Sequence, residues 1–201
     1  MYKPVVVALR RAPQIPLEEQ LEQVMTPFLH DPRHPEEESR CDGWWIGGYW
    51  AGHFLSRHRT ASELVKPLGF PPHSPLGGYT ACDGGPKGLL DLDRLRCTAE
   101  EAVWRRWPRR FAELFGTHRY GENRLAAPSD EDVGRFSGTT TDLLAQARGR
   151  AVVMEGLVTL EGEWVDPEGG WFESLAAYSR ADSYIDSLDD DAWLVCLTVH
   201  F

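Results

Sequence analysis

The sequence predicts a single-domain α+β fold, with a mixed or antiparallel sheet, helices packed on one face, and a long proline- and glycine-rich insertion. Short apolar runs bounded by turn or helix signals predict the strands. Helical periodicity lies between them, in the order β–α, insertion, β–β–α–β. The 201 residues suffice for one substantial core, so we assign 1–201 to one domain.

The first predicted elements are a buried strand and an amphipathic helix. Val5–Ala8 is a β-branched run typical of a buried strand. Apolar side chains recur at helical spacing over 17–29, and Pro16 suits the first turn of that helix. Prolines and glycines are frequent over 60–90, among aromatic and apolar residues, so we expect an ordered, loop-rich excursion there.

A longer helix is expected after this excursion, over 98–115. Thr98 and Glu101 form a capping-box pattern at its start, and Pro108 should kink or divide it. The segment 128–148 has a weaker helical pattern.

The sequence of the last third of the chain predicts three strands and a helix. Val152–Leu160 is a strand pattern, and Glu161–Trp164 forms a tight turn into a short partner strand. A helix over 170–188 is expected to turn Phe172 inward among other apolar residues. Leu194–His200 predicts the closing strand.

Composition narrows the function classes. No apolar run is long enough to span a membrane, and the amino-terminal segment is a poor secretory signal, so a cytoplasmic protein is expected. A net charge of −10 disfavours nucleic acid as a partner. No cofactor fingerprint or metal-ligand spacing is present, so neither cofactor nor metal is expected. Four widely spaced cysteines indicate reduced thiols: Cys41, Cys82, Cys97 and Cys196.

The stretch CDGWWIGGYWAGHF, Cys41 to Phe54, is the candidate ligand site. Its aromatic rings could contact a flat or cationic ligand, and its glycines let the backbone approach closely. The alternative interpretation is a glycine-bent strand whose aromatics fill the core. The segment 68–87 of the excursion is expected to close the pocket. The predicted ligand-binding residues are Trp44, Trp45, Gly47, Gly48, Tyr49, Asp83 and Lys87.

Asp42 and His200 are the predicted acid–base pair. An imidazole beside a carboxylate is held in one tautomer and titrates near neutral pH, as acid–base catalysis requires. His53 is the residue that could join or replace His200. In the alternative interpretation Asp42 caps a turn.

A basic run on the predicted helix is a candidate surface for an acidic protein partner. Its members are Arg105, Arg106, Arg109 and Arg110, and they lie away from the apolar stripe of that helix. The alternative is a solvated face balanced by neighbouring glutamates.

Residues 42–52 resemble the Asp-Trp-Tyr-x-Ile-Gly-Gly-Arg-Trp-x-Gly motif of an uncharacterised family of small proteins from actinobacteria and their phages. Later features resemble that family in the same order: the step Pro86–Asp93, a Gly-x-Trp hairpin, a Gly-Trp-Phe element and a penultimate His200. Tyr49 stands where the family has arginine, so an anion-binding role of that position is not expected here. The resemblance implies no particular activity.

These features together predict a small enzyme that uses acid–base chemistry on a small polar or heteroaromatic metabolite, with Tyr49 orienting the substrate. The alternative is a noncatalytic protein that sequesters a metabolite or inhibits a protein partner. The noncatalytic protein would use the same aromatic stretch or the arginine run.

Overall fold

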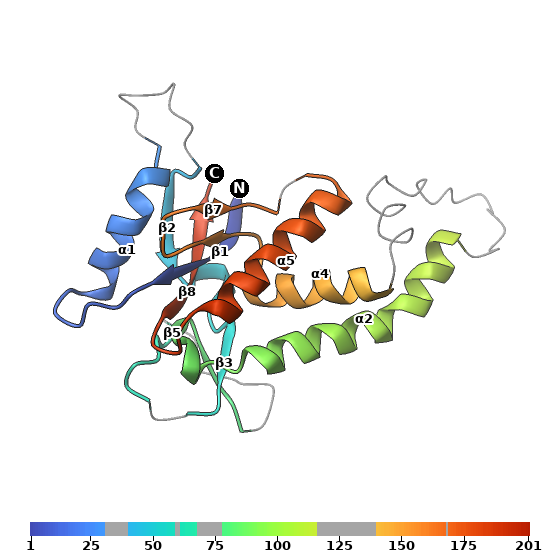
Figure 1. Ribbon diagram of the computed structural model, residues 1–201, viewed down its shortest axis with the longest axis horizontal. Helices are drawn as coiled ribbons and strands as arrows, with labels where there is room; N and C mark the ends of the chain where they lie inside the picture. The colour runs from blue at the N-terminus through green and yellow to red at the C-terminus, as the bar shows by residue number, and fades with distance from the viewer. Residues whose placement is uncertain (31–39, 59–60, 68–77, 116–139, 168) are drawn as a thin grey trace.

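A mixed sheet lies between two helical layers (Figure 1). The computed structural model describes residues 1–30, 40–58, 61–67, 78–115, 140–167 and 169–201, with the backbone alone described over 106–115 and at Thr140. The sheet follows the order β2 (Gly43–Ile46), β8 (Trp193–His200), β1 (Tyr2–Leu9), β6 (Leu157–Val158) and β7 (Trp164–Val165), while β5 (Gly84–Pro86) also pairs with β8.

The centre of the sheet is the pair β1 and β8, which run antiparallel from Tyr2 opposite His200 to Leu9 opposite Trp193. Side chains alternate between the two faces of a strand. Both faces of this pair are covered along most of its length, so β1 needs a continuous apolar run. β6 is parallel to β1, which makes the sheet mixed, as the sequence predicted.

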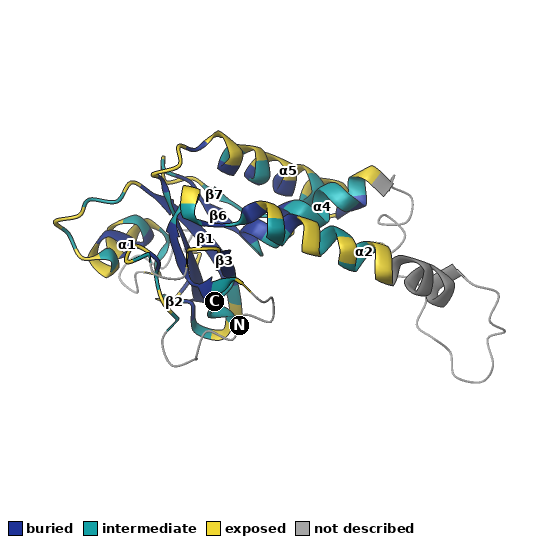
Figure 2. Ribbon diagram, turned by 90° about the horizontal axis from the view of Figure 1, so that it is seen from below, coloured by how far each residue is buried: buried dark blue, intermediate teal, exposed yellow. Residues whose placement is uncertain are grey.

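Helices cover both faces of the sheet. Val5 and Val7 pack against α1 (Leu17–Met25), which is followed by the 3₁₀ turn η1 (Thr26–Phe28). Val6 and Ala8 pack toward α4 (Thr140–Val153) and α5 (Trp171–Ser187). Figures 1 and 2 show α1 on one side of the sheet and α4 and α5 on the other.

The α+β class is therefore as predicted, but the placement of the helices differs from the sequence prediction of one covered face. A central strand that is apolar on both faces requires cover on both. α1 supplies the second layer, with Leu21 and Met25 fully buried against the sheet.

The edge of β8 opposite β1 is shared by two strands that lie end to end. β2 and β5 are both antiparallel to β8, and they pair with its two halves. Between them the backbone of Cys196 accepts a hydrogen bond from Gly47 at 2.9 Å and donates one to Asp83 at 2.7 Å. The chain between Gly47 and Asp83 thus leaves the sheet and returns to a neighbouring position.

This excursion is built differently from the loop-rich 60–90 segment that the sequence predicted. It contains η2 (Gly48–Trp50) and a two-stranded sheet of β3 (Phe54–Ser56) with β4 (Thr80–Cys82). The chain then enters β5 and the turn η3 (Lys87–Leu89) within the predicted segment. Residues 59–60 and 68–77 lie outside the described part of the chain.

The predicted strand Val152–Leu160 is wrong over its first half. α4 continues to Val153, and the Met154 amide still donates to the Arg150 carbonyl at 2.9 Å. Met154 then adopts a left-handed φ of +58°, which ends the helix. The β-branched pair before it is buried on the helix, where packing overrides strand propensity.

α2 (Leu92–Phe115) begins six positions before the predicted start at Thr98 and is not divided at Pro108. Its cap is Asp91, whose carboxylate accepts the Arg94 amide at 3.0 Å, while the Thr98 hydroxyl donates to the Arg94 carbonyl. In α5 the predicted inward residue Phe172 is 66% exposed, and its neighbour Trp171 is buried instead. Of the segment 128–148, residues 128–139 lie outside the described chain.

None of the described helices is long and apolar enough to cross a membrane.

Val195→Asp should unfold the protein. Val195 is fully buried in the layer facing α1, and an isolated buried carboxylate costs several kcal/mol. Phe172→Asp is the control, because it adds the same group at an exposed site. Thermal melting monitored by circular dichroism checks both variants. A wild-type melting temperature for Val195→Asp would contradict the described packing.

Candidate functional site

Two left-handed glycines turn the aromatic stretch back over the sheet. Gly47 has a φ of +65° and Gly48 a φ of +57°, conformations that L-residues with a Cβ rarely adopt. A Cβ on Gly48 would lie 2.0 Å from Nε1 of Trp45. The backbone therefore passes close to the N–H edge of that indole, and η2 carries Tyr49 to within 6.4 Å of the Trp45 ring.

Four rings gather at this corner of the sheet, and we call them the aromatic surface: Tyr2, Trp45, Tyr49 and His200. Tyr2 is central, with ring-centroid separations of 5.3 Å to Trp45, 5.0 Å to Tyr49 and 4.8 Å to His200. Trp45 and Tyr49 are 6.4 Å apart with ring planes at 61°. The surface is open, because Tyr49 is 72%, Tyr2 44% and Trp45 37% exposed.

Tyr2 is the member of this surface that the sequence prediction missed. The predicted strand started at Val5, whereas β1 starts at Tyr2 and places it directly opposite His200. The strand alternation could have indicated Tyr2, because Tyr2, Pro4 and Val6 are alternate residues and lie on the same face of the strand.

Asp42 and His200, the predicted acid–base pair, lie together beside the aromatic surface. Oδ2 of Asp42 is 3.3 Å from Nδ1 of His200, and the Asp42 amide donates to the His200 carbonyl at 2.7 Å. A carboxylate at Nδ1 favours the tautomer that carries its proton there, which leaves Nε2 as the basic nitrogen. Both side chains are partly exposed, so solvent or a ligand can reach them.

Trp44 and Trp50 are not part of the aromatic surface. Trp44 lies opposite Val199 and packs in the layer facing α1, because neighbouring residues of a strand point to opposite faces. Trp50 packs against the core beneath α4 and α5. The structure thus places Trp44, a predicted ligand residue, on the other side of the sheet.

The side chain of Asp83 links the two ends of the excursion between Gly47 and Asp83. Its side chain is 1% exposed, and Oδ1 accepts the Gly52 amide at 2.5 Å. A Cβ on Gly47 would lie 2.4 Å from Oδ2, so the carboxylate is pressed against the glycine backbone. Burial raises the pKa of the Asp83 carboxyl, and the hydrogen bond from Gly52 opposes that rise. The geometry favours a structural role over the predicted ligand contact.

His53 and Lys87 are engaged elsewhere. His53 Nε2 lies 3.2 Å from the Val152 carbonyl oxygen, which can only accept, so that nitrogen carries the hydrogen. Burial lowers the pKa of His53 to about 4, so the imidazole is neutral. Lys87 Nζ donates to the Asp186 carbonyl at 3.0 Å and to that of Leu188, at the end of α5.

The basic run on α2 is described only in part. Arg105 forms an ion pair with Glu101 one helical turn away, with 3.0 Å between nitrogen and oxygen. The side chains of Arg106, Arg109 and Arg110 lie outside the described residues, so a protein partner at this helix stays a prediction.

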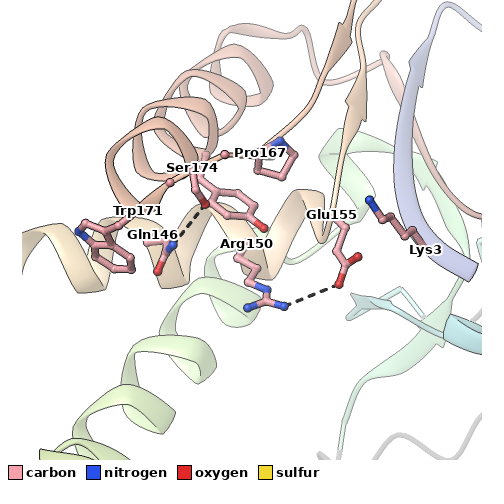
Figure 3. Close-up of a pocket in the computed structure, with 10 residues that line it drawn as sticks. Lys3, Gln146, Arg150, Glu155, Pro167, Trp171 and Ser174 are labelled. Carbon is pink, nitrogen blue, oxygen red and sulfur yellow. Dashed lines mark hydrogen bonds and ion pairs between the residues drawn. The ribbon is translucent and has the colours of Figure 1, made fainter. Parts of the chain in front are cut away.

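A separate polar cavity of about 210 Å³ lies among α4, α5 and the start of β1 (Figure 3). Arg150 reaches toward Glu155, with 3.7 Å between Nη2 and Oε1, and the Gln146 amide donates to the Ser174 hydroxyl at 3.4 Å. The cavity holds charges of both signs. It is lined by Lys3, Gln146, Arg150, Glu155, Pro167, Gly169, Gly170, Trp171, Ser174 and Tyr178, none of which belongs to the aromatic surface.

Three of the four cysteines are buried and unsuited to nucleophilic chemistry. Burial raises the pKa of Cys41 to about 11 and that of Cys82 to about 12, and it raises the pKa of Cys196 as well. Within the described ranges, no cluster of three or more histidine, cysteine or acidic side chains could hold a metal ion.

No family model, curated protein or solved structure matches this chain. The resemblance to the actinobacterial and phage family therefore stays a prediction, and the geometry of the site carries the functional argument.

Gly47→Ala should destabilise the protein by about 2 kcal/mol more than Gly162→Ala does, as overpacking typically costs. Both glycines have positive φ, so both variants carry the left-handed strain, but a Cβ at Gly162 meets nothing within 4 Å. Urea unfolding measures the difference. Equal losses in the two variants would show that Asp83 does not press on Gly47.

The titration of His53 should lower the stability as the pH falls. In the folded protein the pKa of His53 is about 4, below its ordinary value of 6.5. The contribution of the neutral imidazole to the free energy of unfolding is therefore fully present above pH 6.5. It is lost as the pH falls toward 4, because the unfolded chain binds the proton more readily. The loss is at most about 3 kcal/mol. His53→Gln keeps a donor for the Val152 carbonyl but does not titrate. Urea unfolding at pH 7 and pH 5 should show a smaller loss for the variant than for wild type.

Proposed function

We propose that the protein binds a small molecule on the aromatic surface, in the cytoplasm, where the four free cysteines stay reduced. The observation that carries this proposal is that Tyr2, Trp45 and Tyr49 gather at one corner of the sheet and are all exposed. Aromatic residues that served only the core would be buried. Exposed contiguous apolar patches mark interaction sites. Tyrosine and tryptophan add a hydroxyl or N–H at the ring edge, which favours a planar, polar ligand.

The position of Tyr49 supports this proposal over the core-filling alternative. Two glycines with positive φ and a close glycine–indole approach bring that ring beside Trp45. A segment that only filled the core would bury Tyr49, as it buries most of Trp50.

A second candidate function, acid–base catalysis, is favoured by the Asp42–His200 contact of 3.3 Å. Nε2 of His200 would take a proton from a ligand stacked on Tyr2, and Asp42 would stabilise the resulting imidazolium. Tyr49 would orient the substrate, as the sequence indicates. The openness of the surface favours binding over catalysis, because catalytic sites usually exclude water from the reacting groups.

Native mass spectrometry of the protein after incubation with a small-molecule cell extract tests both candidates. We expect a bound mass that is lost in the double variant Trp45→Ala/Tyr49→Ala and kept in Trp104→Ala, which removes an equally large, 55% exposed ring from α2. Retention of the ligand by the double variant would refute the site.

The same experiment separates the two functions. A binding protein returns the ligand unchanged, whereas an enzyme releases an altered mass. His200→Gln should abolish such a conversion while the ligand still binds. An altered mass that forms equally with His200→Gln would exclude His200 as the base.

A further inference from the structure

We propose that the ligand of the aromatic surface is a small organic cation of the alkylammonium type. This inference rests on the proposed function and names the chemical class of its ligand. The face of an aromatic ring is electron-rich, and cations are attracted to it, most strongly to tryptophan and tyrosine.

Trp45 and Tyr49 are two neighbouring exposed rings that are steeply inclined to each other. Their centroids are 6.4 Å apart and their planes meet at 61°. One cation can lie within about 6 Å of both centroids when two rings are this close, which is the range of the interaction. Tyr2 contributes a third ring, tilted 72° to Trp45 and 53° to Tyr49.

The charges around this corner also favour a cation. Asp42 is an exposed carboxylate that contacts His200, which itself lies 4.8 Å from the Tyr2 ring. Two positive groups at the same end of β1 keep their charge but are held at Phe201: the Met1 ammonium donates to the Phe201 carbonyl, and the Lys3 ammonium lies over the Phe201 ring. The chain as a whole carries −10, which attracts cations at long range.

A neutral aromatic ligand would stack on the same rings but would gain nothing from the negative charge of Asp42. An anion is disfavoured by Asp42 and by the net charge. A metal ion would need several oxygen or nitrogen ligands, and the described residues form no such cluster here. An alkylammonium ion instead binds through ring faces and one nearby carboxylate, which is the set of groups that this corner presents.

Titration with choline tests the inference, with 3,3-dimethylbutan-1-ol as the neutral molecule of the same shape and nicotinamide as a neutral heteroaromatic ring. The readout is the Trp45 indole N–H resonance in a proton–nitrogen NMR spectrum, assigned with Trp45→Phe. We expect choline to bind about tenfold more tightly than its neutral analogue. Tyr49→Ala and Asp42→Asn should each weaken choline binding severalfold, whereas Trp104→Ala should leave it unchanged.

The outcomes separate this inference from the proposed function. Equal affinity for choline and its neutral analogue overturns the cation, as does binding of nicotinamide without binding of choline, and the aromatic site survives in both cases. If none of the three probes shifts the Trp45 resonance, the cation is overturned and the mass-spectrometry experiment decides whether the surface binds anything. If the single variants Asp42→Asn and Tyr49→Ala both bind choline as tightly as wild type, choline does not bind on the aromatic surface and the inference is overturned.

Discussion

The structure depends on one shared stretch of backbone, where Cys196 of β8 bonds both to Gly47 and to Asp83. These two contacts place the end of β2 beside the start of β5 and close the excursion between them. The Asp83 carboxylate links the two ends of the excursion by accepting a hydrogen bond from the Gly52 amide. A buried carboxylate is costly unless it is hydrogen-bonded, and a hydrogen bond to a charged acceptor is stronger than a neutral one. The hydrogen bond from Gly52 therefore offsets part of the cost of burying Asp83, and it holds the two ends of the excursion together.

The aromatic surface exists because the helical layer covers only part of one sheet face. Val6, Ala8 and Leu194 lie beneath α4 and α5 and are buried, whereas Tyr2 and His200 follow the same alternation on the same face but remain partly exposed. Strand periodicity thus places apolar and aromatic residues on one continuous face, and the reach of the helices divides that face into core and surface. Tyr49 joins it because the glycine pair ends β2 and turns the chain.

The sequence was sufficient for features set by local pattern and insufficient for those set by tertiary contacts. The apolar runs of β1 and β8 and the periodicity of α5 were recognisable, because each is a local pattern of neighbouring residues. The strand assigned to Val152 failed, since β-branched residues suit a buried helix end as well as a strand. The proximity of Asp42 to His200 follows from the register of β2 on β8, which the sequence analysis did not predict. The structural use of Asp83, His53 and Lys87 could not be predicted, because their partners lie 31 to 101 positions away.

The end-to-end meeting of β2 and β5 also has a consequence for how this protein can change over evolutionary time. Because the excursion leaves and rejoins β8 at neighbouring residues, its length hardly affects the register of the sheet. Doubling a flexible loop costs only about 0.6 kcal/mol in closure entropy. Insertions and deletions between Arg57 and Tyr79 should therefore accumulate in relatives at positions other than Leu64, which is buried in the core, and Val65, which pairs with Gly84. The two flanking segments, which carry the glycines and Asp83, should keep their spacing to β8.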